Sequence, residues 1–550
     1  MIGQKDVIER LERSVKQYTH LRKYIESFVK KGYRFPEFHV QLRAEMAKLE
    51  DFNILYPVHD PVFIHVFTDV HKQKRYEVIE PSMNEETKKK YDEILSLMLK
   101  QAPYESPHET KAEFEATIER LLKKVTTTEK EKRVFFSRFK FKKDLVHTLP
   151  EEYEDLRYFL KRNILEHGLI EPLVRDPYIE DIHNVGTTTI HVVHRVFGML
   201  KTNINFENEV ALDEFLRGLS ERIGKPVSDA KPIIDGSLPD GSRINIIYSE
   251  DVSKRGSSFT IRKFTEKPIT MTQLVKWGTM SPEIAAYLWL CLEHGMSIVV
   301  SGETASGKTT SLNAMLTFVN HNAKVYTAED TPEVIAPHPV WQRLVTREAG
   351  PEGSRVELFD LIRTALRSRP NYIVVGEVRG KEGFVMFQAM QTGHSVLSTF
   401  HAPSTKQMIQ RFTGDPINVP IRFMDNLNVA LFQQILYEGG RLIRRCTSVD
   451  EILRYSKELD GVMTRSVFKW DPFSDTHYFR GMNNSYILED KIAPMLKLED
   501  KRMIYEELRF RAKIIKNMVD RNILDYDDVN AIFRSYYHEG FDGIPQELKS

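Results

Sequence analysis

MSIVVSGETASGKTT, residues 296–310, joins an apolar run to a loop that is bounded by two glycines and closed by lysine and threonine. This spacing fits the pattern Gly-x-x-x-x-Gly-Lys-(Ser/Thr), in which backbone N–H groups surround phosphates and the lysine reaches the β and γ oxygens. The hydroxyl after the lysine ligates Mg²⁺, so Thr309 is the predicted metal ligand. We therefore predict a site for ATP and Mg²⁺, with these nucleotide-contacting residues: Gly302, Glu303, Thr304, Ala305, Ser306, Gly307, Lys308, Thr309 and Thr310.

The residues on both sides of this loop support the prediction. A short β-branched run precedes it, and apolar residues recur at helical spacing from Leu312 to Val319. The N-terminus of such a helix directs partial positive charge at a phosphate. Further runs alternate with helical patterns, which predicts a mainly parallel sheet covered on both faces; the predicted strands are Ser297–Val300, Lys324–Thr327, Tyr372–Val375 and Ser395–Thr399.

Composition limits the class of protein. A chain of 550 residues is too long for one core, and 78 basic residues balance 78 acidic ones, which argues against a globally basic nucleic-acid binder. The two cysteines, Cys291 and Cys446, exclude a disulfide framework and a four-cysteine zinc site. No run approaches the ~18 to 20 apolar residues that span a bilayer, and charged residues stand where a signal peptide needs apolar ones. These features predict a cytoplasmic protein.

The pattern of elements predicts an α/β chain in several parts. Residues 1–150 are expected to form a helical region with a β-hairpin at Pro61–Val70 and Arg75–Ile79, and residues 151–264 an α+β domain. TEKPIT, residues 265–270, contains a proline and no periodicity, so it is the predicted linker. The phosphate loop then belongs to a P-loop ATPase domain, residues 271–550, with helices at its C-terminal end.

Two segments leave alternatives open. Residues 1–34 carry an apolar stripe that predicts one long helix, with nine basic and four acidic residues and thus a net charge of +5. Such a helix can lie on anionic lipid or dock on a partner, or it can bury its stripe on neighbouring helices. KEKRVFFSRFKFKK, residues 130–143, interleaves aromatic and basic residues, which suits nucleic acid, an acidic partner or simple packing of the phenylalanines.

Acidic residues follow the second and third predicted strands of the core. YTAEDTPE, residues 326–333, places Glu329, Asp330 and Glu333 at the carboxyl edge of the sheet, where they can orient water or Mg²⁺-bound water. The alternative for one of them is a helix cap formed by Asp330. NYIVVGE, residues 371–377, has the layout of a Walker B segment, with Gly376 where many such enzymes carry aspartate. Glu377 is therefore expected to act on Mg²⁺ through water.

A histidine pair follows the fourth predicted strand. TGHSVLSTFHA, residues 392–402, carries His394 and His401 seven residues apart. On a β-rich segment after a Walker B strand, this pair predicts phosphate-sensing or water-positioning groups.

In this order, EDTPE, IVVGEVRG and TGHSVLSTFHA resemble the Asp box, atypical Walker B segment and His box of the type II/type IV secretion ATPase superfamily, and EDTPE resembles its archaeal branch. YIEDIHNV, residues 178–185, LPDGSRI, residues 238–244, and TIRKF, residues 260–264, are similar to the N-terminal domain of that superfamily. ILYPVHDPVFIHVF, residues 54–67, further resembles the motor ATPase of the archaellum.

The resemblance implies a RecA-like core in a homohexamer of bilobed subunits, peripheral at the inner face of the cell membrane, that drives filament assembly through a polytopic membrane partner. It implies that Glu333 is the catalytic carboxylate, Glu377 the Walker B glutamate, and His394 and His401 the His box, beside the phosphate-loop Lys308. It also implies that Arg255 and Arg262 of the N-terminal domain reach the nucleotide.

Two other functions are compatible with a phosphate loop, a nucleic-acid motor and a nucleotide-gated adaptor. A nucleic-acid translocase or helicase would share the phosphate loop and sheet, but the balanced charge and the Asp and His boxes favour the filament motor, and no nucleic acid is expected as a partner. A nucleotide-gated adaptor would not need Lys308, Thr309, Glu333 and Glu377 together. The sequence leaves open the choice between archaellum and pilus, between assembly and rotation, and between Glu329 and Glu333.

Overall fold

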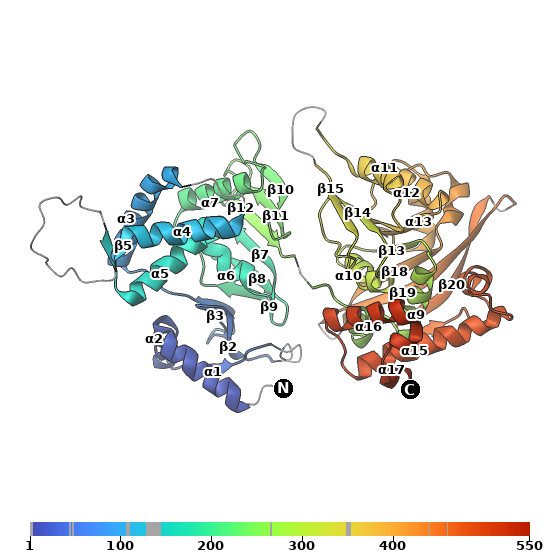
Figure 1. The fold of residues 1–550 in the computed structure, drawn as a ribbon, viewed down its shortest axis with the longest axis horizontal. Helices are drawn as coiled ribbons and strands as arrows, with labels where there is room; N and C mark the ends of the chain where they lie inside the picture. The colour runs from blue at the N-terminus through green and yellow to red at the C-terminus, as the bar shows by residue number, and fades with distance from the viewer. Residues whose placement is uncertain are drawn as a thin grey trace, which may run out of the picture. The chain divides into compact units, whose positions relative to one another are not determined.

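The computed structural model describes residues 4–42, 46, 49–105, 110–127, 145–264, 267–347, 354–438, 441–458 and 460–550. The chain forms two compact units, Met1–Phe264 and Thr265–Ser550, whose elements Figure 1 labels. The unit boundary falls at Phe264, while Thr270, at the end of the predicted linker, is already buried and donates its hydroxyl to the Leu524 carbonyl at 3.0 Å. Within the described ranges, no helix is long and apolar enough to cross a membrane.

One sheet runs through the whole first unit. Its described strands follow the order β1-β2-β3-β4-β9-β8-β7-β12-β11-β10. Strand β4 pairs in parallel with β9, and Tyr76 on β4 and Tyr56 on β2 both donate to the buried carboxylate of Asp176. The predicted separation of residues 1–150 from residues 151–264 is therefore wrong, because strands from both segments share one sheet and one core. The strands are β1 Glu37–Phe38, β2 Asn53–His59, β3 Val62–Thr68, β4 Lys74–Ile79, β7 Ile179–Val185, β8 His191–His194, β9 Gly198–Thr202, β10 Ile233–Ser237, β11 Arg243–Ile247 and β12 Ser258–Arg262, with a separate pair β5 Thr126–Thr127 and β6 Val146–His147.

The predicted hairpin is confirmed by the antiparallel pairing of β3 with β4. Strand β2 was missed because Pro57 interrupts its apolar run, and proline usually excludes a central strand. The structure accommodates it with a shift of register between Pro57 and His59.

The predicted single helix over residues 1–34 is two helices, α1 and α2, because Tyr18 has extended backbone, φ −109° and ψ 104°. Leu21 and Ile25 on α2 are buried in one core with residues of β2, β3 and β4, and the buried Phe28 packs edge-on against His65 and Phe67 of β3. The packed alternative therefore holds for the stripe of α2. Residues 130–143 lie outside the described residues. The helices of this unit are α1 Gln4–Gln17, α2 Thr19–Lys30, α3 Glu85–Gln101, α4 Lys111–Val125, α5 Pro150–Leu160, α6 Glu171–Arg175 and α7 Glu209–Arg222.

The second unit contains a mixed sheet with the order β15-β14-β16-β17-β13-β18-β19-β20-β21 in its described residues. Pairing is parallel from β15 to β18 and antiparallel from β18 to β21, which confirms the predicted parallel core. The long strands β18 and β19 were missed because glutamines and arginines conceal their apolar alternation. The strands are β13 Ile298–Gly302, β14 Val325–Glu329, β15 Trp341–Val345, β16 Tyr372–Glu377, β17 Ser395–Phe400, β18 Val429–Glu438, β19 Arg441–Ser456, β20 Gly461–Asp471 and β21 Thr476–Phe479.

Helices cover both faces of this sheet, as predicted. Ile298 and Val300 belong to a core shared with α9, α10, α15 and α16, whereas Val299 belongs to a core shared with α11, α12 and α13. Figure 1 shows the second set of helices gathered on one side of the strands and α9, α15 and α16 on the other. The helices are α8 Met271–Lys276, α9 Pro282–Glu293, α10 Lys308–Met315, α11 Leu358–Ser368, α12 Glu382–Gln391, α13 Thr405–Thr413, α14 Ala493–Met495, α15 Ile504–Asp520, α16 Tyr526–Glu539 and α17 Gln546–Lys549.

Candidate nucleotide-binding site

The phosphate loop connects the end of β13 to the start of α10. Gly302 lies opposite Gln433 of β18, and a Cβ on it would stand 2.2 Å from the Gln433 carbonyl oxygen. Gly307 has a φ of +91° as the residue that precedes α10, a conformation that L side chains rarely adopt. Both glycines are therefore required by the backbone, which carries free N–H groups to the start of the helix.

Lys308 lies at the centre of the site. Its Nζ donates to the Glu303 carbonyl at 2.9 Å and lies 3.5 Å from Nδ1 of His401. Burial lowers the pKa of Lys308, although the negative charges of Glu377 and Glu333 act in the opposite direction. The ammonium thus lies at the phosphate loop, within range of the charges of two carboxylates, where a phosphate can replace its present neutral partners.

Glu377, at the end of β16, contacts two side chains, His401 and Arg379. Its Oε1 lies 2.6 Å from His401 Nε2, and its Oε2 accepts from Arg379 Nη2 at 2.6 Å. Burial acts to raise the pKa of Glu377, but the bond from Arg379 and the surrounding positive charge outweigh it and lower the pKa.

The imidazole of His401 is neutral in this arrangement. Burial lowers the pKa of His401 against the opposing charge of Glu377. Its Nε2 lies beside Glu377 and its Nδ1 beside Lys308, so the two ring nitrogens stand between a carboxylate and an ammonium. The lysine, histidine, glutamate and arginine form one continuous line of polar contacts.

The structure separates the two predicted histidines. His394 stands just before β17 and His401 just after it. Six residues of strand at about 3.3 Å each place them roughly 20 Å apart. Nδ1 of His394 lies 3.0 Å from the Thr392 hydroxyl, whereas His401 stands at the phosphate loop of this unit. A phosphate-sensing or water-positioning role for His394 stays a prediction.

The acidic segment after β14 gives its carboxylates different surroundings. Glu329 is 1% exposed, and its Oε1 accepts from the backbone N–H groups of Glu333 at 2.9 Å and Val334 at 2.8 Å. Burial raises the pKa of Glu329 to about 7, although these N–H bonds oppose it. The exposed Glu333 is instead close enough for its charge to act on Lys308. Asp330 caps no helix; its Oδ1 accepts from the Thr346 hydroxyl at 3.2 Å.

Gly376 occupies the position where many Walker B segments carry aspartate. A Cβ there would lie 3.0 Å from Cγ of Glu329, so the neighbouring glutamate fills the space that a larger residue would need. Two oxygen groups near the loop are of the hard type that Mg²⁺ prefers. They are the Thr309 hydroxyl, on the first turn of α10, and the ionised Glu377 carboxylate. The residues at the loop therefore fit a magnesium nucleotide.

Sequence reasoning missed three residues of this site. Arg379 forms the ion pair with Glu377 described above, and Arg444 of β19 donates from Nε to the carbonyl of Ala305 at 2.9 Å. Gln433 of β18 donates to the Ser311 hydroxyl at 2.6 Å. Arg444 and Gln433 carry no motif and reach the loop only because β18 pairs with β13, so no local pattern could have identified them.

The two predicted arginines of the first unit are exposed. Nε of Arg262 lies 3.9 Å from an oxygen of Asp181, and the carbonyl of Arg255 packs against Gly186. Their contact with nucleotide stays a prediction.

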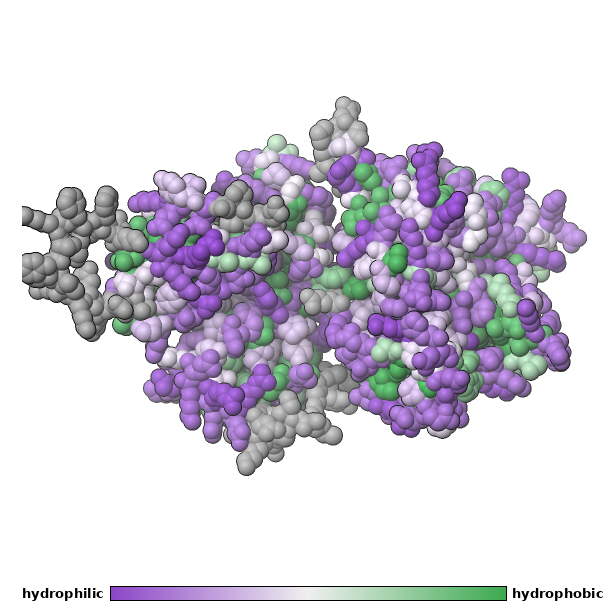
Figure 2. Space-filling model, in the orientation of Figure 1, coloured by the Kyte–Doolittle hydropathy of each residue, from purple (hydrophilic) through white to green (hydrophobic). Residues whose placement is uncertain are grey.

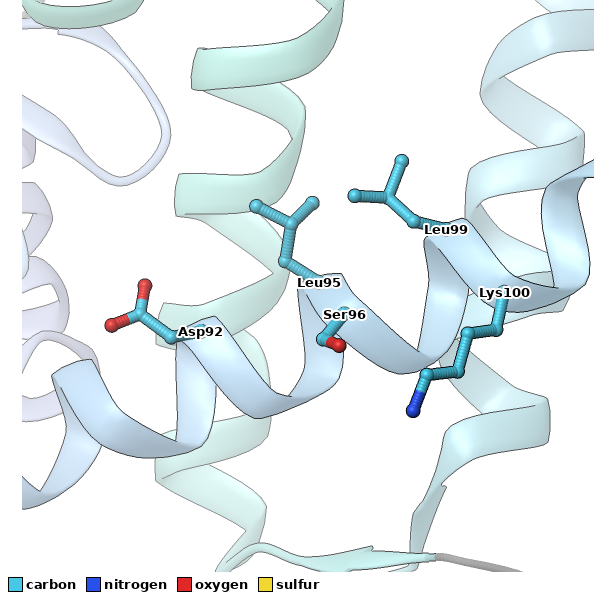
Figure 3. Close-up of a pocket in the computed structure, with 5 residues that line it drawn as sticks. All are labelled: Asp92, Leu95, Ser96, Leu99 and Lys100. Carbon is cyan, nitrogen blue, oxygen red and sulfur yellow. The ribbon is translucent and has the colours of Figure 1, made fainter.

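A hollow lies in a different region, along α3, where five residues line a space of about 450 Å³. Figure 3 shows these residues, Asp92, Leu95, Ser96, Leu99 and Lys100. None of these residues belongs to the predicted motifs. The phosphate loop is therefore identified by its backbone and contacts rather than by a deep cavity.

Comparison with known proteins gives consistent results. A family model described as type II/IV secretion system protein matches residues 163–455. An uncharacterised protein of Methanocaldococcus jannaschii is 55% identical over 97% of this chain and 98% of its own length. The type IV secretion system protein VirB11 of Bartonella quintana is 24% identical over 46% of this chain and 78% of its own length. The crystal structure of the Legionella pneumophila ATPase DotB is 16% identical, covers 65% of this chain and 92% of its own, and superimposes with a TM-score of 0.38.

Proposed function

The chain belongs to the type II/IV secretion system protein family, and from that membership we propose that it is a Mg²⁺-dependent ATPase that powers assembly, and possible rotation, of an archaellum or type IV pilus-like filament through a membrane platform protein. The observation that carries the ATPase assignment is the line of contacts from the phosphate loop through Lys308 and His401 to Glu377. This line brings residues from three parallel strands to one point, as nucleotide hydrolysis requires.

Each residue has a defined role in this proposal. The loop N–H groups and Lys308 bind the β and γ phosphates, and Thr309 with Glu377 would hold the Mg²⁺, which supplies positive charge to the phosphates. Glu333 accepts a proton from the attacking water. His401, held neutral beside Glu377, orients the groups around the γ-phosphate.

Two substitutions test this assignment. Lys308→Ala should abolish ATP turnover, because the phosphates lose their nearest mobile positive charge. Glu333→Gln should bind ATP yet hydrolyse it about 10² to 10⁴ times more slowly, because the amide cannot accept a proton. Glu329→Gln is the matched control, since an amide oxygen can still accept the two N–H bonds that Glu329 accepts. An active Glu333→Gln protein beside an inactive Glu329→Gln protein would reverse the choice of carboxylate.

The arginines of the first unit are proposed to complete the site in a homohexamer. Arginine contacts to the transferring phosphate are worth ~10³-fold or more in related phosphoryl transfer. Arg255→Ala and Arg262→Ala should therefore lower kcat in the full chain, whereas Arg217→Ala, an exposed residue of α7, should not. Turnover per subunit should also fall on dilution, and turnover independent of concentration would contradict a ring that assembles in that range.

A peripheral membrane location is proposed through the basic surface of α1 and α2. The apolar residues Leu21, Ile25 and Phe28 of α2 are buried, so lipid contact would rest mainly on charged residues, and Figure 2 shows a mainly hydrophilic face. Each nearby lysine or arginine contributes ~1 kcal/mol toward anionic headgroups before screening. The exposed basic residues of this surface are Arg10, Arg13, Lys16, Arg22, Lys23, Lys30, Lys31 and Arg34.

Stimulation of turnover separates this proposal from a nucleic-acid motor. Acidic lipid vesicles should raise ATP turnover in low salt, and charge reversal at Arg22 and Lys23 should remove that response without changing the basal rate. Single-stranded DNA or RNA should have little effect. Strong, salt-sensitive activation by nucleic acid alone would reject the filament-motor proposal in favour of a translocase.

A further inference from the structure

Asn313 joins the helix of the phosphate loop to the segment that carries Glu333. It lies on α10, five residues after Lys308, and is 7% exposed. Its Nδ2 donates to the Glu333 carbonyl at 3.0 Å, and its Oδ1 accepts from the Ile335 N–H at 3.0 Å. One side-chain amide therefore binds the backbone on both sides of Val334, in the way that a neighbouring strand would.

The segment that Asn313 holds has no regular structure of its own. Residues 331–337 form neither helix nor strand, so their position depends on contacts from outside. Val334 and Ala336 are buried in the core that α10 shares, and hydrogen bonds fix the backbone around them. On one side Glu329 accepts from the N–H groups of Glu333 and Val334, and Arg343 donates to the Pro332 carbonyl at 2.9 Å. These two anchors belong to β14 and β15, at the far side of the sheet from β13. Asn313 supplies the anchor on the side of the phosphate loop.

This placement connects two parts of the reaction. Lys308 and Asn313 share one short helix, in which five residues span about 7.5 Å, so a shift of the helix on phosphate binding moves both residues together. The buried amide cannot release its two partners without leaving a donor and an acceptor unsatisfied. A shift of α10 is therefore transmitted to the backbone of Glu333.

We propose that Asn313 is a positioning residue that couples occupancy of the phosphate loop to the position of the Glu333 carboxylate. The inference rests on the proposed function, in which Glu333 accepts the proton of the attacking water. It assigns no chemistry to Asn313 itself, which touches only backbone atoms.

Three full-length variants test the coupling. Asn313→Ala removes both bonds, and Asn313→Asp keeps the size and the acceptor for Ile335 but loses the donor to the Glu333 carbonyl. Asn320→Ala is the control, because Asn320 lies just beyond the same helical segment and its side chain bonds only the N–H of Asn322 among the described contacts. The expected result for both Asn313 variants is a kcat about tenfold lower, because a displaced catalytic group loses rate steeply with distance. Their Kd for a fluorescent, non-hydrolysable ATP analogue should stay within about twofold of wild type, because the loop itself is unchanged.

Two readouts distinguish positioning from general destabilisation. Hydrogen exchange of the peptide around Val334 and Ile335 should accelerate in Asn313→Ala, while exchange in β16 and β17 stays as in wild type. In a double-mutant cycle, Asn313→Ala should cost nothing further once Glu333 is Gln, because the group that it positions is already absent.

The outcomes separate this proposal from the function on which it rests. A wild-type kcat in Glu333→Gln would overturn the catalytic assignment and the coupling with it. An inactive Glu333→Gln protein beside an Asn313→Ala protein with wild-type kcat would overturn the coupling alone. A full, additive loss in the double mutant, or a parallel rise in Kd, would show that Asn313 only stabilises the fold of the site.

Discussion

Replacing Gly302 with alanine tests whether the phosphate loop depends on its contact with β18. The new Cβ would lie 2.2 Å from the Gln433 carbonyl oxygen and 2.8 Å from the Ser306 hydroxyl oxygen, whereas an ordinary contact begins at 3.4 Å. Because the obstacle in β18 is backbone in a paired strand, it cannot rotate aside. The loop or the strand must therefore move by about 1.2 Å, the difference between 3.4 Å and 2.2 Å.

The cost of this displacement sets the expected effect. Forcing an added methyl group into a packed site costs about 1–3 kcal/mol. If the loop yields rather than the sheet, that cost falls on nucleotide binding, and ATP affinity drops by roughly 5- to 150-fold at 1.4 kcal/mol per tenfold change. Titration with a fluorescent ATP analogue measures the affinity, and thermal unfolding without nucleotide reports any cost to the fold.

The matched control is Gly218→Ala on α7, where a Cβ would meet nothing within 4 Å. That variant should keep its affinity for ATP and should lose no thermal stability, because alanine favours a helix interior over glycine by about 1 kcal/mol. The argument that the close approach of β18 fixes glycine at this position would be refuted by one result. In that result the Gly302→Ala protein binds ATP within twofold of wild type and its melting temperature is unchanged.

Three further predictions concern single side chains. Glu329→Gln should gain stability over wild type as pH rises from about 4.5 to about 7, because over that range the carboxyl is ionised in the unfolded chain but keeps its proton in the folded one. The difference in the free energy of unfolding reaches at most about 3 kcal/mol, and thermal unfolding across that pH range measures it. Arg444→Ala should raise the KM for ATP several-fold with kcat retained, since the loop loses its bond at Ala305, whereas Arg454→Ala, an exposed arginine on the same strand, should leave KM unchanged. His401→Gln should lower turnover about tenfold more than His394→Gln, and equal losses would contradict their separation by the length of β17.

Features that depend on neighbouring residues could be predicted from the sequence, whereas features that depend on residues far apart in the chain could not. The phosphate loop, the strand before it and the Walker B strand are local patterns, so their spacing alone predicted β13, α10 and β16. The contacts of Glu377 with His401 were partly foreseeable, because parallel strands bring their carboxyl ends to one edge. The sequence placed His394 and His401 on either side of one strand, but the contact of His401 with Lys308 was needed to show which of them lies beside the phosphate loop.

Contacts that depend on strand order could not be predicted. Arg444 lies 139 residues after Ala305 and reaches it only because β19 follows β18 beside β13. Asn313 resembles any polar residue of a short helix until the segment after β14 is placed against it. The continuity of the first unit was missed for the same reason, because the pairing of β4 with β9 joins residues 75–76 to residues 201–202.

The positive side chains around the phosphate loop must balance the negative charge of a magnesium nucleotide. Lys308 and Arg379 contribute two positive charges, and Glu377 and Glu333 cancel them, while burial keeps His401 neutral. A magnesium nucleotide adds roughly two negative charges, and more negative charge gathers on the leaving phosphates in the transition state. Arg444 of β19 and Arg411, which donates to the His401 carbonyl, supply two further cations. The additional negative charge of the transition state can use more positive charge, and we propose that the exposed Arg255 and Arg262 supply it.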